Sequence, residues 1–154
     1  MYNIVEIIIT ILDEDLEHYT PNKSLSGNIY WKLDDELYFP EENWYDFPLT
    51  LLTWWTESLV QIAIRSIDKA DLIFMDGPQI VTISIHGDDC LAISCRESKS
   101  LPPFYTGVVN KKKFIRRFVL ASTRFLDWCK NHNVECDFIT LDHNLRSLKQ
   151  QYHQ

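Results

Sequence analysis

The chain has 154 residues and a formal net charge of −7, and 45% of its residues are hydrophobic and 24% are charged. This composition is typical of one soluble globular domain, which at this length needs no metal or disulfide to fold. No segment approaches the roughly 20 apolar residues of a membrane helix, and the first apolar segment lacks the basic leader of a signal peptide, so we expect a cytoplasmic protein.

The pattern of hydrophobic residues predicts strands and then a helix in the first 66 residues. Residues 2–12 and 29–33 alternate between apolar and polar side chains, as half-buried strands do, and residues 37–39 are expected to continue the second strand. The acidic residues 13–27 are predicted to form a loop. In residues 48 to about 66, apolar side chains recur at steps of three and four, which predicts an amphipathic helix.

The middle of the chain predicts three short strands. They cover roughly residues 71–75, 79–86 and 90–96, and turns that contain Gly, Pro and Asp separate them. We expect these strands to form an antiparallel meander. Residues 98–107, which include two consecutive prolines, are predicted to be a loop.

The last part of the chain predicts two helices. Asn110 is a plausible N-cap for a helix of about five turns that ends near residues 131–133, and residues 138–152 predict a short third helix. The elements together predict a single α+β domain over residues 1–154, in the order β-β-α-β-β-β-α followed by the short helix. We expect one antiparallel sheet with two long helices packed on it.

The sequence offers little for catalysis or metal binding. The four cysteines lack C-x-x-C spacing, which predicts reduced, buried thiols. Residues 86–90 gather His, Asp and Cys side chains, but their place between two strands predicts a hairpin turn. The run of three acids at residues 34–36 resembles a cation site, yet neighbouring residues of an extended segment point to opposite faces. We therefore expect no catalytic residue, no metal and no cofactor.

Charge is distributed unevenly along the chain. Residues 1–57 hold 12 acidic and 2 basic residues, whereas residues 110–154 hold 4 acidic and 9 basic ones. Three lysines, Lys111 to Lys113, fall in the first turn of the predicted second helix, where the helix dipole disfavours each cation by about 0.3–1 kcal/mol. Either the acidic half of the molecule or an anionic ligand must compensate. The net charge of −7 opposes a nucleic acid, so we expect neither a nucleic-acid nor a membrane partner.

Acidic side chains and aromatic rings are interleaved in the first third of the chain. This mixture is typical of protein interfaces, where rings supply buried area and charges supply steering. We predict a partner-binding surface that consists of Trp31, Asp34, Asp35, Glu36, Glu41, Glu42, Trp44, Tyr45, Asp46, Trp54 and Glu57. The alternative is that the acids are merely solvated and the aromatic residues belong to the core.

The segment Phe39–Pro48, followed by Leu51-Leu52 and Trp54-Trp55, carries a resemblance. Its pattern F-P-x-x-x-W-x-D-F before a tryptophan-bearing helix is similar to that of several families of immunity proteins, which are encoded beside polymorphic or contact-dependent bacterial toxins. The resemblance implies a stoichiometric inhibitor that neutralises a cognate toxin without catalytic residues or a cofactor. The segment also has a structural interpretation, in which two prolines bracket a turn and the aromatic residues pack beneath it.

Three hypotheses follow from the sequence. The first is an immunity-type protein whose acidic surface binds a basic toxin domain, for example a nuclease. The second is a small enzyme with a site in residues 86–90 or among the clustered carboxylates. The third is a regulatory or scaffolding module that self-associates through its oppositely charged halves, and this hypothesis leaves the oligomeric state open.

Overall fold

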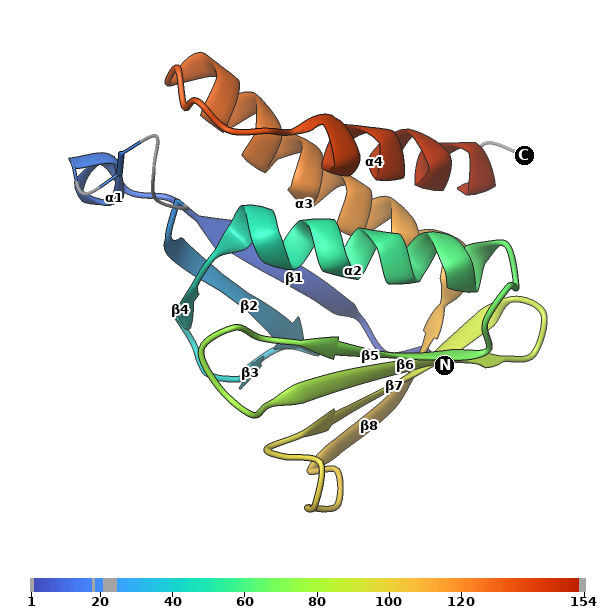
Figure 1. Cartoon of the computed structure of the whole chain (residues 1–154). Helices are drawn as coiled ribbons and strands as arrows, with labels where there is room; N and C mark the ends of the chain where they lie inside the picture. The colour runs from blue at the N-terminus through green and yellow to red at the C-terminus, as the bar shows by residue number, and fades with distance from the viewer. Residues whose placement is uncertain (1, 18, 21–24, 153–154) are drawn as a thin grey trace.

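Two antiparallel sheets lie on one side of three long helices (Figure 1). The computed structural model describes residues 2–17, 19–20 and 25–152. The first sheet consists of β1 (Val5–Thr10), β2 (Gly27–Leu33), β3 (Leu37–Phe39) and β4 (Tyr45–Asp46). The second consists of β5 (Lys69–Ile73), β6 (Ile80–His86), β7 (Cys90–Arg96) and β8 (Tyr105–Asn110). The helices are the short α1 (Asp13–Glu17) and the longer α2 (Pro48–Ala63), α3 (Lys111–Asn131) and α4 (Ile139–Tyr152).

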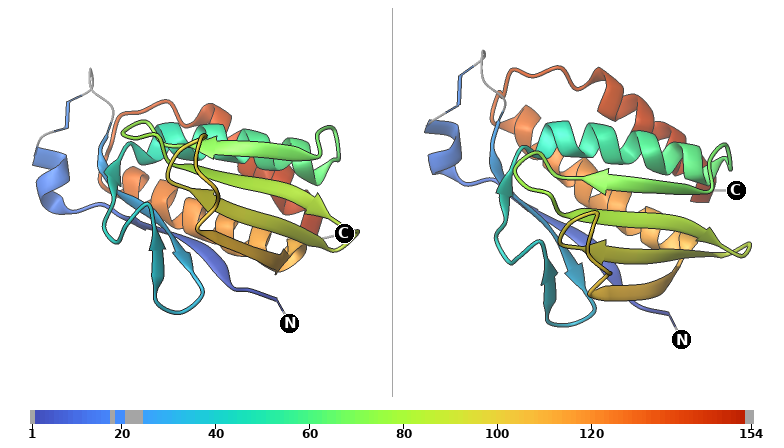
Figure 2. Two further views of the ribbon diagram at one scale, coloured as in Figure 1. Left: turned by 90° about the horizontal axis from the view of Figure 1, so that it is seen from below. Right: turned by 60° about the horizontal axis from the view of Figure 1, so that its bottom comes forward.

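The two sheets meet at the start of β1. There the Asn3 backbone N–H donates to the Val108 carbonyl at 2.8 Å, and the Val108 N–H donates to the Asn3 side-chain oxygen at 3.1 Å. Beyond this point the sheets lie at an angle to one another (Figure 2). In the first sheet β2 is central, because β1 pairs with one edge of it, whereas β3 and β4 pair with different parts of the other. The second sheet is a meander in the order β5-β6-β7-β8.

Aromatic side chains from three elements fill the centre of the core. Trp31 of β2 is completely buried, and its ring centre lies 5.5 Å from that of Trp55 in α2 and 6.1 Å from that of Phe114 in α3. The Trp55 indole N–H also donates to the Ile73 carbonyl of β5 at 2.9 Å. These contacts join both sheets to α2 and α3 in one continuous hydrophobic core.

The last helix, α4, packs on α2 and α3 on the side away from the sheets (Figure 1). Its buried Asn144 amide donates to the Thr56 hydroxyl at 3.1 Å and approaches the Thr53 carbonyl at 3.5 Å. A buried amide needs such partners to avoid an uncompensated desolvation cost. Within the described residues, no helix combines the length and the apolar character that crossing a bilayer requires.

The α+β class is confirmed, and so are both long helices, the C-terminal helix and the three-strand meander, with bounds that differ by a few residues. The predicted loop at residues 13–27 is wrong in part, because it contains α1. Acidic residues in the first turn favour this helix, and the Asp15 carboxylate accepts a hydrogen bond from the Leu12 N–H at 2.8 Å. Within that predicted loop, residues 18 and 21–24 lie outside the described part of the chain.

The predicted order of elements and the single sheet are also wrong. Residues 37–39 do not continue β2 but turn back as β3, because Asp34 adopts a φ of 57° and reverses the chain. The predicted loop 98–107 ends too late, and β8 was not predicted: Tyr105, the first residue of β8, pairs with Cys95 of β7. The two-residue strand β4 was not predicted, because so short a segment has no measurable period.

Candidate protein-binding surface

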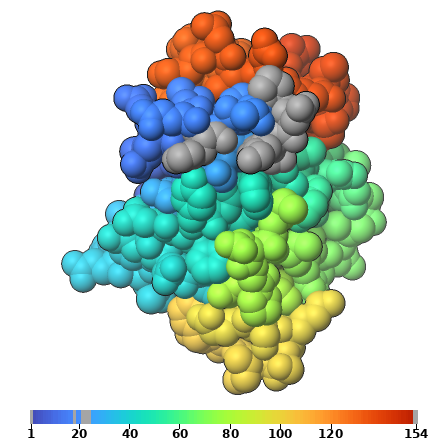
Figure 3. Space-filling model, turned by 60° about the vertical axis from the view of Figure 1, so that its left-hand side comes forward, coloured from blue at the N-terminus to red at the C-terminus, as the bar shows by residue number. Residues whose placement is uncertain are grey.

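Three segments that are distant in sequence lie side by side at one end of the molecule. The Tyr45 hydroxyl of β4 donates to the Asp15 carboxylate of α1 at 2.8 Å. Trp44 packs edge-on against Phe74 with ring centres 6.1 Å apart, and this places the loop before β4 beside the loop that follows β5. Figure 3 views this side, on which α1, the segment around residues 34–47 and the segment around residues 74–79 follow one another. We call α1, residues 40–46, residues 74–79 and the β2–β3 turn at residues 34–36 the acidic end. The turn follows Leu33, at the other end of β2 from its pairing with β4, but it lies on the same side of the molecule in Figure 3.

The acidic end carries a high density of unneutralised negative charge. Apart from Asp34, which is also exposed and is described below, its exposed carboxylates are Asp13, Glu14, Glu17, Asp35, Glu36, Glu41, Glu42 and Asp76. The four segments contain no lysine or arginine. None of these carboxylates forms an ion pair with a lysine or arginine of the described chain, and two ion pairs lie elsewhere, between Arg65 and Asp88 and between Arg146 and Asp142. The charge therefore faces solvent and is available to a cationic partner.

Two of the predicted surface carboxylates hold the fold together. Asp46 is only 2% exposed, and its oxygens accept hydrogen bonds from the Phe47 N–H at 2.8 Å, the Trp44 indole N–H at 3.0 Å and the Asp76 N–H at 3.2 Å. It thus ties the start of α2 to the loop after β5.

Asp34 is exposed, but its carboxylate accepts hydrogen bonds from the Asn3 amide, the Ile4 N–H and the Tyr105 hydroxyl at 3.0 to 3.3 Å. Burial and the Asp34 charge raise the pKa of the Tyr105 phenol. Asp34 therefore joins the β2–β3 turn to the two segments that meet at the junction between the sheets, namely the residues just before β1 and the start of β8. This role gives it a structural reason to be acidic that is independent of any partner.

The predicted aromatic residues differ in their accessibility. Trp31 is completely buried in the core and cannot touch a partner in this structure. Trp44 is half-buried under the loop that it belongs to, whereas Tyr45 is 48% exposed and Trp54 is 40% exposed. Trp54 and the exposed Glu57 lie on the solvent side of α2. Only Phe47 separates this helix from β4. The accessible part of the predicted surface consists of Asp35, Glu36, Glu41, Glu42, Tyr45, Trp54 and Glu57, together with Asp34, whose carboxylate is engaged in the hydrogen bonds described above.

The structure adds residues to this surface that the sequence analysis did not select. The acids of α1 join it through the Tyr45–Asp15 hydrogen bond, and Met75, which is 50% exposed, joins it beside Asp76. The run of acids at residues 13–17 was visible in the sequence, but nothing in it indicated contact with β4. Met75 and Asp76 had no signal beyond a turn-forming Asp-Gly-Pro sequence.

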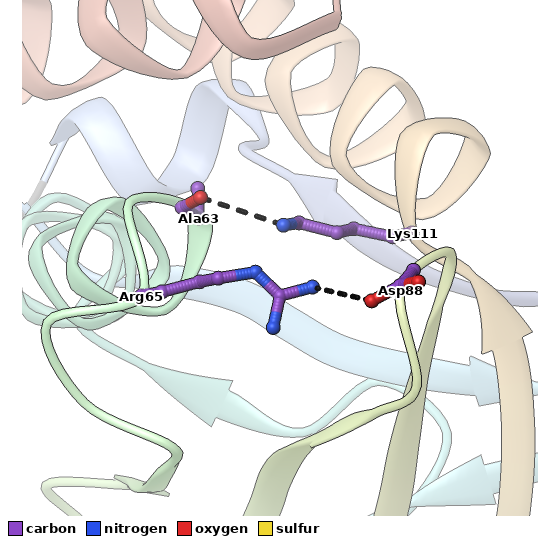
Figure 4. A network of polar contacts seen from close by, with 4 residues as sticks. All are labelled: Ala63, Arg65, Asp88 and Lys111. Atoms are coloured by element: carbon purple, nitrogen blue, oxygen red, sulfur yellow. Dashed lines mark hydrogen bonds and ion pairs between the residues drawn. The ribbon is translucent and has the colours of Figure 1, made fainter.

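The opposite end of the molecule explains Lys111, the first of the three lysines at the start of α3. The Lys111 ammonium donates to the Ala63 carbonyl, at the C-terminal end of α2, at 3.4 Å, and Arg65 lies 3.7 Å from the Asp88 carboxylate (Figure 4). The negative end of one helix dipole thus offsets a cation at the positive end of another. Burial and the nearby Arg65 lower the pKa of Lys111, and Asp89 opposes this shift. Compensation within the molecule accounts for Lys111 without an anionic ligand.

The candidate enzyme segment at residues 86–90 forms the hairpin turn that the sequence predicted. His86 pairs with Cys90 across the ladder, and Gly87 adopts a φ of 76° in the turn. A hollow of about 270 Å³ beside it is lined by residues that include Asp88, Asp89 and Lys111. Among the described residues, no cluster of three His, Cys, Asp or Glu side chains could hold a metal ion.

The four cysteines are all free thiols. Cys95 and Cys129 are buried, and burial is the main cause that raises the pKa of each to about 12. Cys90 and Cys136 are partly exposed, so the prediction of buried thiols holds for two of the four.

No protein-family model matches the chain, and neither a curated protein nor a solved structure is significantly similar to it.

Proposed function

We propose that the chain is a non-catalytic inhibitor of the immunity type, which binds a basic toxin domain through its acidic end. One observation carries the proposal: eight exposed carboxylates lie on segments that contain no lysine or arginine. None of the eight forms an ion pair with a lysine or arginine of the described residues. The resemblance of residues 39–55 to immunity proteins supplies the class of partner.

The physical basis of the proposal is electrostatic complementarity. A surface of one sign accelerates association with the opposite sign and suppresses association with its own. A nuclease must present cations to hold phosphates, so an acidic protein surface can occupy the same site. Tyr45 and Met75 are exposed within this end, and Trp54 is exposed on α2, which follows β4; these side chains would supply the apolar contacts that anchor such an interface.

The test uses the neighbouring gene. We expect a large secreted protein with a small basic C-terminal domain to be encoded immediately upstream, and the purified domain to form a 1:1 complex with this chain in calorimetry. Expression of the chain should protect cells from that domain. Absence of both complex formation and protection would contradict the proposal.

A further inference from the structure

The strand β1, at the edge of the first sheet, pairs with a neighbouring strand on one side only. Its partner is β2, and at the other, open edge the Asn3 N–H reaches β8 before β1 begins. The Ile4 carbonyl accepts a hydrogen bond from the Asp34 N–H, on the β2 side. Because the backbone groups of an antiparallel strand alternate in direction, the N–H and C=O groups of Val5, Ile7 and Ile9 point toward the open edge.

The accessible part of this edge lies at Ile7 and Ile9, which line a groove, whereas Val5 is only 1% exposed. Within the described residues, no backbone hydrogen bond joins Val5, Ile7 or Ile9 to a further strand. Edge strands of this kind are templates for strand addition unless they are covered, charged or interrupted by proline. The sequence of β1, Val-Glu-Ile-Ile-Ile-Thr, has high strand propensity, contains no proline and has one charged residue.

A groove lies between this edge of β1 and the helix α3. Its volume is about 420 Å³, and it is lined from the strand by residues that include Ile7 and Ile9 and from the helix by residues that include Arg117, Leu120, Arg124 and Trp128. The helix residues recur at steps of three and four, so they form a stripe of their own beside the core stripe of α3. Leu120 is 48% exposed on this stripe. An edge strand beside a helix is a geometry that binds extended peptides by strand addition.

The charge of the groove selects the chemistry of the peptide. Arg117 and Arg124 face it from α3, and Glu6 lines it from β1. Neither arginine forms an ion pair with Glu6 or with another carboxylate of the described residues. Two guanidinium groups with unfilled donors favour carboxylates, which they bind in strong charge-assisted hydrogen bonds. The groove is therefore opposite in sign to the acidic end.

We propose that this groove binds an extended, acidic segment of a partner protein, which adds to β1 as a further strand. Alternate side chains of the segment would face α3, where carboxylates meet Arg117 and Arg124 and apolar side chains contact Leu120 and Trp128. A second copy of this chain paired through β1 would bring a second pair of arginines to the same place, so the charge favours a different protein. The groove shares no lining residue with the acidic end, and the proposal does not depend on the proposed function.

A phage-displayed library of random 12-residue peptides, selected on the intact protein, tests the proposal. We expect enriched peptides that combine Asp or Glu with Val, Ile or Leu in alternation. In fluorescence anisotropy, Arg117→Glu/Arg124→Glu should weaken the binding of a synthetic enriched peptide by about tenfold or more. The control Lys113→Glu/Lys130→Glu makes the same charge change at exposed positions of α3 outside the groove and should leave the binding unchanged.

The backbone part of the proposal has its own readout. Peptide binding should slow the amide hydrogen exchange of Ile7 and Ile9, and N-methylation of alternate peptide amides should abolish binding in one of the two registers. Selection that enriches no acidic peptide would overturn the proposal. So would equal binding to the groove and control variants, or a stable dimer in light scattering whose formation protects these same amides.

Discussion

Replacement of Asp46 with alanine tests whether one buried carboxylate holds the acidic end together. Asp46 is 2% exposed and accepts hydrogen bonds from the Trp44 indole N–H at 3.0 Å and the Asp76 N–H at 3.2 Å, in addition to the Phe47 N–H at 2.8 Å. A hydrogen bond to a charged group contributes about 1.5–3 kcal/mol, and a donor left unsatisfied by removal of its partner costs about 1–3 kcal/mol. Water can partly replace Asp46 as the acceptor for the Phe47 N–H at the start of α2. The expected loss of stability therefore comes from the hydrogen bonds to the Trp44 indole and the Asp76 N–H. We expect Asp46→Ala to lower the free energy of unfolding by about 3–5 kcal/mol.

Urea unfolding followed by tryptophan fluorescence and circular dichroism measures this change. The matched control is Glu41→Ala, which removes an exposed carboxylate of the same end and should change the free energy of unfolding by less than about 0.5 kcal/mol. The free energy of unfolding of Asp46→Asn should lie between those of the two variants, because asparagine keeps one acceptor oxygen but places its NH2 group against one or more of the N–H donors. An Asp46→Ala variant as stable as the control would refute the structural role of Asp46.

Three further predictions concern the core and the thiols. Trp55→Ala should lower the free energy of unfolding by about 3–5 kcal/mol, whereas Trp54→Ala should lower it by less than about 1 kcal/mol, because only the first ring is buried; equal losses in urea unfolding would contradict the orientation of α2. A thiol reagent at pH 8, read by mass spectrometry, should label Cys90 and Cys136 much faster than Cys95 and Cys129, and the reverse order would be inconsistent with the burial described above. Because the folded pKa of Cys95 and Cys129 is raised to about 12, the unfolded chain loses these protons at a lower pH, and the free energy of unfolding should fall as the pH rises from about 9 toward 12. Denaturation at several pH values under reducing conditions checks this, and a Cys95→Ala/Cys129→Ala variant should show a smaller slope.

Periodicity predicted the elements whose faces have different environments. The strand β7 and the helices α2 and α3 each bury one face, and their apolar residues recur accordingly. Alternation also placed Trp31 on the same side of its strand as Ile29 and Leu33, and all three are fully buried. Trp31 entered the predicted surface because of its acidic neighbours, although the strand pattern already indicated the core.

The elements that escaped prediction depend on contacts between distant segments. β8 contains Gly107, where a Cβ atom would lie 2.7 Å from the Tyr105 hydroxyl and 3.0 Å from the Asn3 side chain, so the glycine reflects the junction between the sheets and not a loop. The role of Asp46 likewise depends on the Asp76 N–H, 30 residues later in the chain. No local pattern indicates such a partner, and the division into two sheets could not be predicted for the same reason.

The acidic end itself could be predicted only in part. Its charge follows directly from the residue types in the sequence. The acids at residues 35, 36, 41 and 42 are exposed, as the sequence suggested. The distinction between a carboxylate that faces solvent and one that satisfies buried donors is a property of the fold. Asp34 and Asp35 are neighbours, yet only the first has hydrogen-bond donors around it in the described structure.

The rate of association with the C-terminal domain of the proposed cognate toxin tests the central claim most directly. Stopped-flow mixing at low and high salt should show that Asp35→Lys/Glu41→Lys slows association by about tenfold or more at low salt and reduces its dependence on salt. The matched variant Asp88→Lys/Asp89→Lys makes the same charge change at the opposite end and should have a much smaller effect. Equal rates for the two variants at both salt concentrations would contradict recognition through the acidic end.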